Sequence, residues 1–433
     1  MGSRDRQILR LAVPSIVSNI TVPLLGLVDV AIVGHMGSAD YIGAISVGSM
    51  IFNILYWIFG FLRMGTSGMT SQALGRRDLT AVTQLLCRSV AVGLAVATAI
   101  VVLQVPLKHL AFLIVSPEDN ILRLASTYFN ICVWGAPAML VMYGLTGWYI
   151  GMQNTRFPML ISIAQNLVNI AVSLLLVYGF GMKVEGVALG TLIAQYAGAA
   201  ISLLLLSSHY SRLWKYARWK GLFEKRKMLE FFKVNNDIFL RTLCLVAVNL
   251  YFLSAGARQG ALILAVNTLL VQLYILFSYF LDGFAFAGEA LGGKYYGAHN
   301  PEAFLSTVRR VFGWGCLVAI VFTVVYLVGG QWFLGVITNE REVVEAAAGY
   351  LPWAIAVPLA GVTAFVWDGI FIGITATRGM LLSSVVASVV FFLLYLLLRP
   401  MWANHALWLA FVIYLVVRGG VQTAIFMKCH KKW

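Results

Sequence analysis

Apolar segments of about 20 residues or more follow one another along almost the whole chain. A helix needs about 20 apolar residues to cross the hydrocarbon core of a bilayer, so each segment is a candidate transmembrane helix. The sequence therefore predicts an all-α integral membrane protein with twelve transmembrane helices. They are expected near residues 10–34, 43–70, 86–115, 124–150, 158–181, 184–207, 228–254, 260–289, 308–330, 344–372, 379–399 and 404–427.

The composition excludes the soluble domains that a length of 433 residues would otherwise allow. Hydrophobic residues make up 61% of the chain and charged residues only 11%, whereas soluble domains carry roughly 25% charged residues. The net charge of +14 lies in short loops rather than in a basic domain, so no nucleic-acid partner is expected. The five cysteines are scattered without a C-x-x-C spacing, which suggests neither a disulfide framework nor a zinc site.

The distribution of Lys and Arg predicts how the chain is oriented. With twelve helices, 22 of the 31 basic residues fall on the side of the N-terminus, 6 on the opposite side and 3 within spans. Basic residues are enriched in cytoplasmic loops. Both termini are therefore expected in the cytoplasm.

The two halves of the chain resemble each other. "GWYIGMQNTR" at Gly147–Arg156 matches "GIFIGITATR" at Gly369–Arg378 with an offset of 222, and "QALGRR" at Gln72 matches "EALGGK" at Glu289 with an offset of 217. The matches predict two pseudo-symmetric six-helix bundles, as in many secondary transporters. The expected division is an N-terminal lobe at 1–207, a basic cytoplasmic linker at 208–227 and a C-terminal lobe at 228–433.

Polar residues inside the predicted spans are candidates for function, because a charge at membrane depth is costly unless it has a partner or faces a cavity. In the first half Asp29 lies in the middle of an apolar helix, and Asn169 and Ser173 lie one turn apart on the fifth span. Thr191 and Tyr128 are expected to join them. A carboxylate with amide and hydroxyl oxygens suits a proton or a hard cation such as Na⁺. Alternatively, the Asn and Ser side chains have no role in transport and only join helices by hydrogen bonds.

The second half carries more charge. Its expected polar network consists of Asp237, Arg241, Asp282, Glu289 and Asp368. Asp237 precedes Arg241 by one turn, the favourable order for an i, i+4 ion pair. A purely structural network, neutralised by Arg241, is the alternative, and Glu289 lies close enough to the cytoplasmic end to be solvated.

Four stretches resemble the multidrug and toxic compound extrusion (MATE) family, specifically its DinF-like branch. They are "DVAIVGHMG", "NNDIFLRT", "SYFLDGFAFAGEALGGKYYG" and "WDGIFIGITATR", and the similarity runs along essentially the whole chain. The resemblance implies a V-shaped transporter of the bacterial inner membrane that exports amphipathic, often cationic compounds in exchange for H⁺ or Na⁺. No other cofactor is implied. Small organic substrates and membrane lipids are the expected partners, and the chain is expected to be a monomer.

The resemblance also implies roles for particular residues. Asp29 matches the acid of the first helix that couples transport to a proton or cation, and Asn169, Thr191 and Tyr128 match its polar partners. Pro14 matches a proline at which the first helix bends. Ser173 departs from the pattern, because relatives often have a second acid there. A Na⁺ site at Asp29 and Asn169 would therefore hold one carboxylate.

Two other functions compete with export. A lipid-linked oligosaccharide flippase of the same superfamily would be expected to line its cavity with several Arg or Lys, and only Arg63, Arg241 and Arg418 lie within spans. A membrane-embedded transferase is the second alternative, but neither H-E-x-x-H nor G-x-S-x-G occurs. The chain is thus not expected to be an enzyme, and no G-x-x-x-x-G-K-[ST] motif indicates ATP as the energy source.

Overall fold

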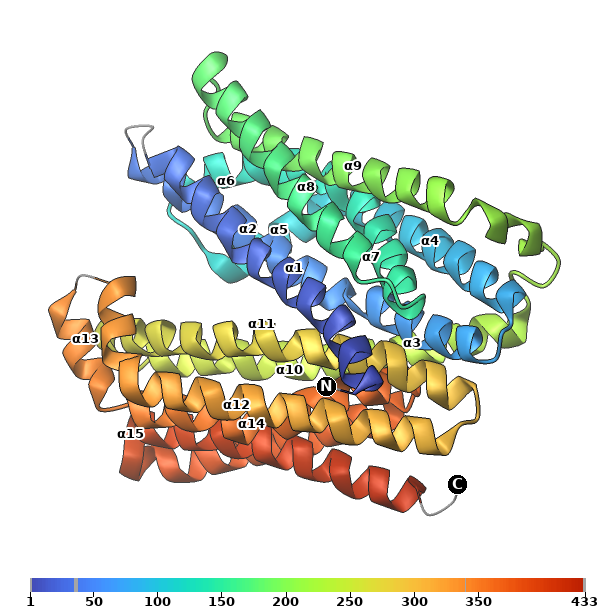
Figure 1. The fold of residues 1–433 in the computed structure, drawn as a ribbon. Coiled ribbons are helices and arrows are strands. Elements are labelled where there is room, and N and C mark those ends of the chain that lie inside the picture. The colour runs from blue at the N-terminus through green and yellow to red at the C-terminus, as the bar shows by residue number, and fades with distance from the viewer. Residues whose placement is uncertain (1, 35–37, 339, 431–433) are drawn as a thin grey trace. The chain divides into compact units, whose positions relative to one another are not determined.

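The computed structural model describes residues 2–34, 38–338 and 340–430, and these residues fold into helices joined by short turns (Figure 1). Part of the "DVAIVGHMG" motif, residues 35–37, lies outside this description. The α-helices are α1 (Ser3–Gly34), α2 (Ala39–Phe59), α3 (Phe61–Gly75), α4 (Leu79–Val102), α5 (Gln104–Val115), α6 (Asp119–Cys132), α7 (Ala136–Gly151), α8 (Arg156–Leu174), α9 (Val184–His209), α10 (Lys225–Ala257), α11 (Ala261–Gly297), α12 (Pro301–Ile337), α13 (Arg341–Ala348), α14 (Leu351–Gly373) and α15 (Thr377–His430). Three short turns of other helix types are η1 (Val133–Gly135), η2 (Leu175–Gly179) and η3 (Ser211–Tyr216).

The helices confirm an all-α membrane protein. Among the described residues, ten helical segments are long and apolar enough to cross a membrane. The last of them contains Ala403, whose φ of 47° and ψ of −116° are not helical, so it holds two of the predicted spans. The first predicted span lies within the 32 residues of α1. The described helices therefore accommodate the twelve predicted spans.

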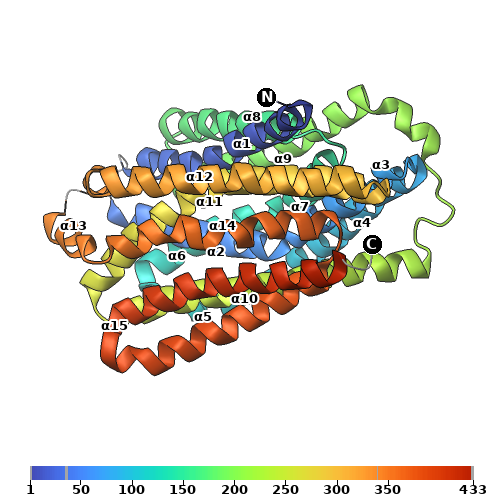
Figure 2. The same cartoon turned by 60° about the horizontal axis from the view of Figure 1, so that its bottom comes forward.

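The chain divides into two compact units, one of residues 1–16 with 233–433 and one of residues 17–232. In the first unit α11 packs on α12 and α14, and α14 packs on α15 (yellow to red ribbons, Figure 2). In the second unit α7 packs on α3 and α4, and α9 packs on α6 and α8. The units differ from the lobes expected from sequence in two segments, because residues 1–16 group with the C-terminal half and residues 208–232 with the N-terminal half.

Each unit has an apolar core in which aromatic side chains fill the space between helices. In the C-terminal unit Trp408, Phe391 and Tyr414 are almost fully buried in one cluster. On the outside of the helices the apolar side chains are exposed; Val328 in α12, for example, is 83% exposed. A helix that is apolar on both its inner and outer faces is stable only where lipid replaces water.

The internal repeat is visible in where the helices end. α3 ends at Gly75 and α11 at Gly297, and the next helices begin at Leu79 and Pro301. Arg77 and His299 then occupy the left-handed region, with φ of 59° and 52°. All these pairs are 222 residues apart. The structure therefore corrects the sequence match at an offset of 217, which aligned the ends of the two helices five residues out of register.

The repeat also fixes the closest approaches between helices. A Cβ atom added to Gly147 in α7 would lie 2.2 Å from the carbonyl oxygen of Arg63 in α3. A Cβ atom added to Gly369 in α14 would lie 2.2 Å from the carbonyl oxygen of Ala285 in α11. Both the glycines and their partners are 222 residues apart. Small residues allow transmembrane helices to approach so closely, and each unit uses this contact once at matched positions.

The start of α1 is attached to the C-terminal unit by polar side chains. Nη1 of Arg310 in α12 donates to Oδ2 of Asp5 at 2.5 Å, and Nε1 of Trp314 lies 3.4 Å from Oδ1. Two residues later the hydroxyl of Tyr295 donates to Oε1 of Gln7 at 3.1 Å. Asp5 precedes the apolar part of α1. The hydrogen bond from Arg310 is the main cause that holds the pKa of Asp5 below its usual value.

Replacement of Gly369 by Ala should destabilise the C-terminal unit, because the added methyl overlaps the main chain of α11. We expect a loss of about 2 kcal/mol or more, within the range of other overpacked cores. Thermal unfolding of the purified protein, followed by tryptophan fluorescence, measures the effect. Gly313→Ala in α12 is the control, since no atom lies within 4 Å of the added Cβ. Equal stability of the two variants would contradict the close approach.

The attachment of α1 should weaken only in acid. A pKa lowered by Arg310 stabilises the folded form above the unfolded value of about 3.9, and this stabilisation disappears as the pH falls through the folded value. Amide hydrogen exchange in residues 3–12, corrected for intrinsic rates, should stay constant from pH 7 to 5 and increase below about pH 4. Asp5→Asn should remove this pH dependence, and an unchanged profile in that variant would exclude Asp5 as its source.

Candidate functional site

A line of buried polar side chains joins α8 to α9 in the N-terminal unit. Nδ2 of Asn169 donates to Oγ1 of Thr191 at 3.2 Å, and Oγ of Ser173 donates to Oδ1 of Asn169 at 3.3 Å. Asn169 and Ser173 are 1% and 0% exposed. The structure thus brings together three of the residues predicted from sequence as one hydrogen-bonded group.

The group depends on a close approach of the two helices. A Cβ atom added to Gly190 in α9 would lie 2.1 Å from Oγ of Ser173 in α8. The missing side chain lets the helices come near enough for the adjacent Thr191 to reach Asn169. Two oxygen-bearing side chains on α8 and one on α9 are therefore held without apolar side chains between them.

The helix that carries Asp29 runs alongside α8. Nδ2 of Asn166 donates to the carbonyl oxygen of Thr21 at 2.9 Å, and the hydroxyl of Tyr178 in η2 donates to the carbonyl oxygen of Ile32 at 3.3 Å. From the first of these contacts, Asp29 lies about 12 Å along α1 and Ser173 about 10 Å along α8, because a helix rises 1.5 Å per residue. Asp29 and Ser173 therefore lie at a similar height along the two helices.

Asp29 itself is buried and incompletely bonded. It is 7% exposed, and within the described part of the chain its Oδ1 accepts no hydrogen bond. It is near enough to Tyr128 and Cys132 in α6 to interact with them electrostatically, while the Tyr128 hydroxyl lies 3.3 Å from that of Ser49. An ionised carboxylate buried without donors is costly. Asp29 needs a proton, a cation or a rearranged neighbour to be stable there.

The C-terminal unit contains a buried ionic network centred on Asp368 in α14. Arg241 of α10 forms an ion pair with Oδ2 of Asp368, and Nη2 of Arg418 in α15 lies 3.3 Å from the same oxygen. Nε2 of Gln422 donates to Oδ1 at 2.6 Å, and Nη1 of Arg418 to the hydroxyl of Tyr414 at 3.3 Å. Both carboxylate oxygens of Asp368 are thus occupied by donors from two other helices.

Arg241 does not pair with the residue expected from sequence. Its ion pair is with Asp368, 127 positions away, while Asp237 accepts a hydrogen bond of 2.8 Å from Oγ1 of Thr377. An i, i+4 spacing allows a contact on one helix face, but a buried guanidinium gains more from an acid that faces it across the bundle. The predicted ion pair between Asp237 and Arg241 is therefore wrong, since both residues are described and each has another partner.

The two other acids predicted for this network lie on α11. Glu289 is 1% exposed, so the solvated position left open by the sequence is wrong. Gly373 makes room for it, since a Cβ atom there would lie 2.5 Å from the Glu289 carbonyl oxygen. Asp282 is partly buried and acts electrostatically on Tyr274, as do Arg241 and Arg418. The charges of Asp282, Arg241 and Arg418 therefore all lie near Tyr274.

Sequence reasoning missed the roles of Arg418, Gln422 and Thr377. Arg418 could have been found, because it is one of three basic residues within the predicted spans and a buried cation requires a counter-charge. Gln422 follows one turn later on the same face. The position of Thr377 against Asp237 has no such signal, since it depends on how α15 packs against α10.

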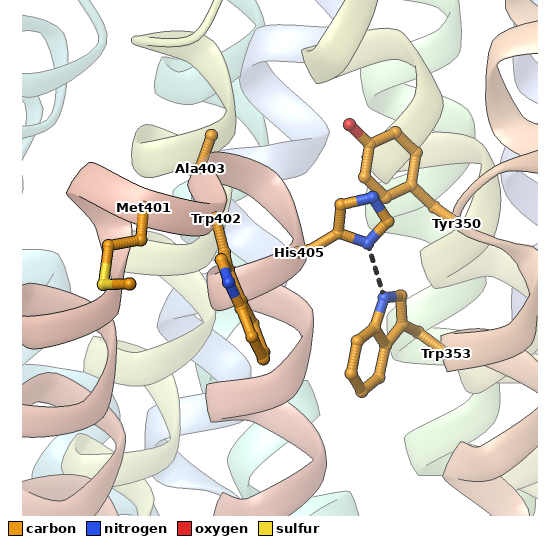
Figure 3. A pocket seen from close by; sticks show the side chains of 6 residues that line it. All are labelled: Tyr350, Trp353, Met401, Trp402, Ala403 and His405. Carbon is orange, nitrogen blue, oxygen red and sulfur yellow. Dashed lines mark hydrogen bonds between the residues drawn. The ribbon is translucent and has the colours of Figure 1, made fainter.

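An aromatic pocket lies at the other end of the C-terminal unit, beside the break in α15. Its cavity of about 540 Å³ is lined by Tyr350, Trp353, Met401, Trp402, Ala403 and His405. Nε1 of Trp353 donates to Nδ1 of His405 at 3.0 Å, and Figure 3 shows His405 between Trp402 on one side and Tyr350 and Trp353 on the other. None of the residues predicted from sequence lines this pocket.

The fold and the buried ionisable groups define a polytopic membrane transport protein, and comparisons with known proteins give its family. The MatE family model matches residues 14–175 and 238–397. DNA damage-inducible protein F of Escherichia coli K12 is 38% identical over 434 residues, which cover 99% of this chain and 93% of that protein. Multidrug export protein MepA of Staphylococcus aureus is 21% identical, over 89% of this chain and 85% of that protein.

Solved structures agree in fold. A multidrug resistance MATE family transporter of the MOP superfamily, in an outward-facing conformation, superposes with a TM-score of 0.88 at 17% identity and covers 100% of this chain and 98% of its own. A MOP superfamily transporter from Pyrococcus furiosus gives 0.85 at 18% identity, over 97% and 94%. The chain belongs to the MATE family, which consists of transporters rather than enzymes.

Replacement of Asp368 by Asn should destabilise the protein strongly, because Arg241 and Arg418 would both lose their buried counter-charge. Breaking a buried ion pair by removal of one partner costs about 3–5 kcal/mol. Asp237→Asn is the matched control, since an amide oxygen can still accept from Thr377, and should cost about 1 kcal/mol. Denaturant unfolding of the purified proteins compares them. Equal stabilities would show that Asp368 is not the centre of the network.

Proposed function

We propose that the protein exports amphipathic or cationic organic compounds from the cytoplasm by antiport with H⁺ or Na⁺, and that Asp29 is the coupling group. The observation that carries the proposal is the buried carboxylate of Asp29, whose Oδ1 accepts no hydrogen bond from the described residues. Binding of a proton or a cation to such a buried carboxylate greatly changes the free energy of the conformation that buries it. Such a change supplies the free-energy difference that biases two conformations.

The neighbouring oxygens support cation coupling. Asn169, Thr191 and Ser173 form one hydrogen-bonded group, and Ser173 lies at a similar height along α8 as Asp29 along α1. Neutral amide and hydroxyl oxygens with one carboxylate suit a proton, or Na⁺ held weakly. In this proposal Tyr128 lies beside the acid and modulates its charge state through its own hydroxyl.

Pro14 is proposed as the point at which α1 bends during transport. Proline lacks the N–H that would complete the helical hydrogen bond to residue 10, so a helix bends easily there. Pro14 lies two residues before the boundary between the compact units, which falls between Ile16 and Val17. Protonation or cation binding at Asp29 would then change how the second half of α1 packs.

The names of several relatives support export of organic compounds. Multidrug export protein MepA and a probable multidrug resistance protein NorM of Thermotoga maritima are among them, at 21% and 23% identity. The flippase alternative is less favoured, because Arg241 and Arg418 are engaged by Asp368. These are two of the three basic residues within the predicted spans that could have bound a pyrophosphate. We place both termini in the cytoplasm of a bacterial cell and expect a monomer.

Replacement of Asp29 by Asn should abolish coupled transport without loss of the protein from the membrane, because Asn cannot cycle its charge. Efflux of a fluorescent organic cation from inverted vesicles measures transport, with the proton and sodium gradients dissipated separately. We expect at least a tenfold decrease in the initial rate, and the gradient to which the wild type is sensitive identifies the ion.

Asp119→Asn is the matched control, since Asp119 is an exposed acid at the start of α6. It should transport like the wild type. Normal transport by Asp29→Asn would exclude Asp29 as the coupling group and direct attention to Asp282 and Glu289.

A further inference from the structure

The basic linker between the two halves is held against the N-terminal unit by its main chain. Three buried side chains in the first half of α4, those of Thr83, Gln84 and Arg88, donate hydrogen bonds to it. Arg88 donates twice to one carbonyl oxygen, at 3.1 and 2.8 Å. The acceptors are the carbonyl oxygens of Tyr216, Arg218, Lys220 and Leu222.

Because the carbonyl groups make these bonds, most side chains of the linker remain exposed, although that of Leu222 is buried. Trp219 is 81% exposed, Phe223 61% and Trp214 47%. Transfer of an aromatic side chain from water to an apolar environment is favourable. With Tyr216, which is 43% exposed, four exposed aromatic residues lie within ten positions and indicate a surface that contacts something other than water.

The same segment is strongly basic. From Arg212 to Lys227 it contains seven Lys or Arg residues and one acid, Glu224. Glu224 lies 3.4 Å from Lys227. Lys215, Arg218 and Lys220 are exposed and form no ion pair within the described part of the chain. Positive charge and exposed aromatic rings thus alternate along a segment whose backbone is fixed.

The ends of the segment determine what it faces. It connects the end of α9 to the start of α10, at the cytoplasmic side predicted by the distribution of basic residues. Trp and Tyr prefer the headgroup level of a membrane, and juxtamembrane Lys and Arg are attracted to anionic lipids of the cytoplasmic leaflet. We propose that residues 212–223 bind the anionic phospholipid surface of that leaflet.

In this arrangement the two residue types have separate tasks. Trp219 and Phe223 insert among the headgroups, and Lys215, Arg218 and Lys220 bind lipid phosphates. Thr83, Gln84 and Arg88 are positioning residues, because they hold the main chain of the segment at a fixed place on α4. The proposal goes beyond transport itself, and it does not depend on which compound or ion is carried.

The test measures which lipids the whole protein retains. The purified full-length chain is equilibrated with labelled phosphatidylglycerol and phosphatidylcholine in detergent, and the ratio of bound lipids is determined. The wild type should retain phosphatidylglycerol preferentially. The triple variant K215Q/R218Q/K220Q should lose at least about fivefold of this preference, because each basic residue near an anionic surface contributes about that factor.

Two further variants separate the contributions. R6Q/R10Q/R76Q removes the same charge from exposed positions elsewhere on the cytoplasmic side and should lower the preference by a smaller factor than K215Q/R218Q/K220Q, because these arginines are not flanked by the exposed rings of the linker. Trp219→Ser with Phe223→Ser should lower retention of both lipids equally, since insertion of apolar rings does not depend on headgroup charge. All variants should keep the melting temperature of the wild type, because the replaced side chains are exposed.

Three outcomes would overturn the proposal. The first is an unchanged lipid preference in K215Q/R218Q/K220Q, and the second is an equal loss in R6Q/R10Q/R76Q, which would assign the preference to overall charge. The third is displacement of phosphatidylglycerol by millimolar inorganic phosphate, which would show a site for a free anion rather than for a membrane surface. Transport activity is not read in any arm, so failure of the export proposal would leave these results unaffected.

Discussion

The cost of charge in a bilayer determines how this protein is built. Asp368 resolves that cost within the fold, since two guanidinium groups and an amide occupy both of its oxygens. Asp29 is buried to the same degree, and its Oδ1 lacks a donor among the described residues. A carboxylate with donors on both oxygens is stabilised in its ionised form, whereas a buried carboxylate oxygen that lacks a donor makes the ionised form less stable. The buried acid of the C-terminal unit is thus matched by donors on both oxygens, whereas Oδ1 of the buried acid in the N-terminal unit is not.

The internal repeat preserves backbone contacts more strictly than chemistry. Gly147 and Gly369 bring matched helices to the same close approach. In contrast, Gly151 meets Thr70 and Ser67, whereas Gly373 meets Glu289 and Gly293. Helix approach is set by main-chain atoms, so side chains facing the interior are free to differ. Each half therefore has the same scaffold with a different set of polar groups.

Sequence alone predicts the features of this fold that depend on local pattern. Spans follow from apolar length and sidedness from the positions of Lys and Arg, while the group of Asn169, Ser173 and Thr191 follows from helical spacing and resemblance to the family. Pairing across the bundle could not be predicted in the same way. Arg241 has one acid within reach on its own helix and several on others. Only tertiary packing determines that its ion-pair partner is Asp368. The offset of 217 failed because similar letters do not fix the register of two helices.

The grouping of α1 with both compact units has a mechanical consequence. Its first turns are attached through Asp5 to Arg310, and its later turns through Thr21 and Ile32 to α8 and η2. One continuous helix cannot follow two bodies that rotate differently unless it bends or one attachment breaks. We expect a bend at Pro14 to cost less free energy than breaking an attachment, because the helical hydrogen bond at Pro14 is already missing. If α1 bends at Pro14 as proposed, its packing against α8 and η2 can change while its first turns keep their attachment to Arg310.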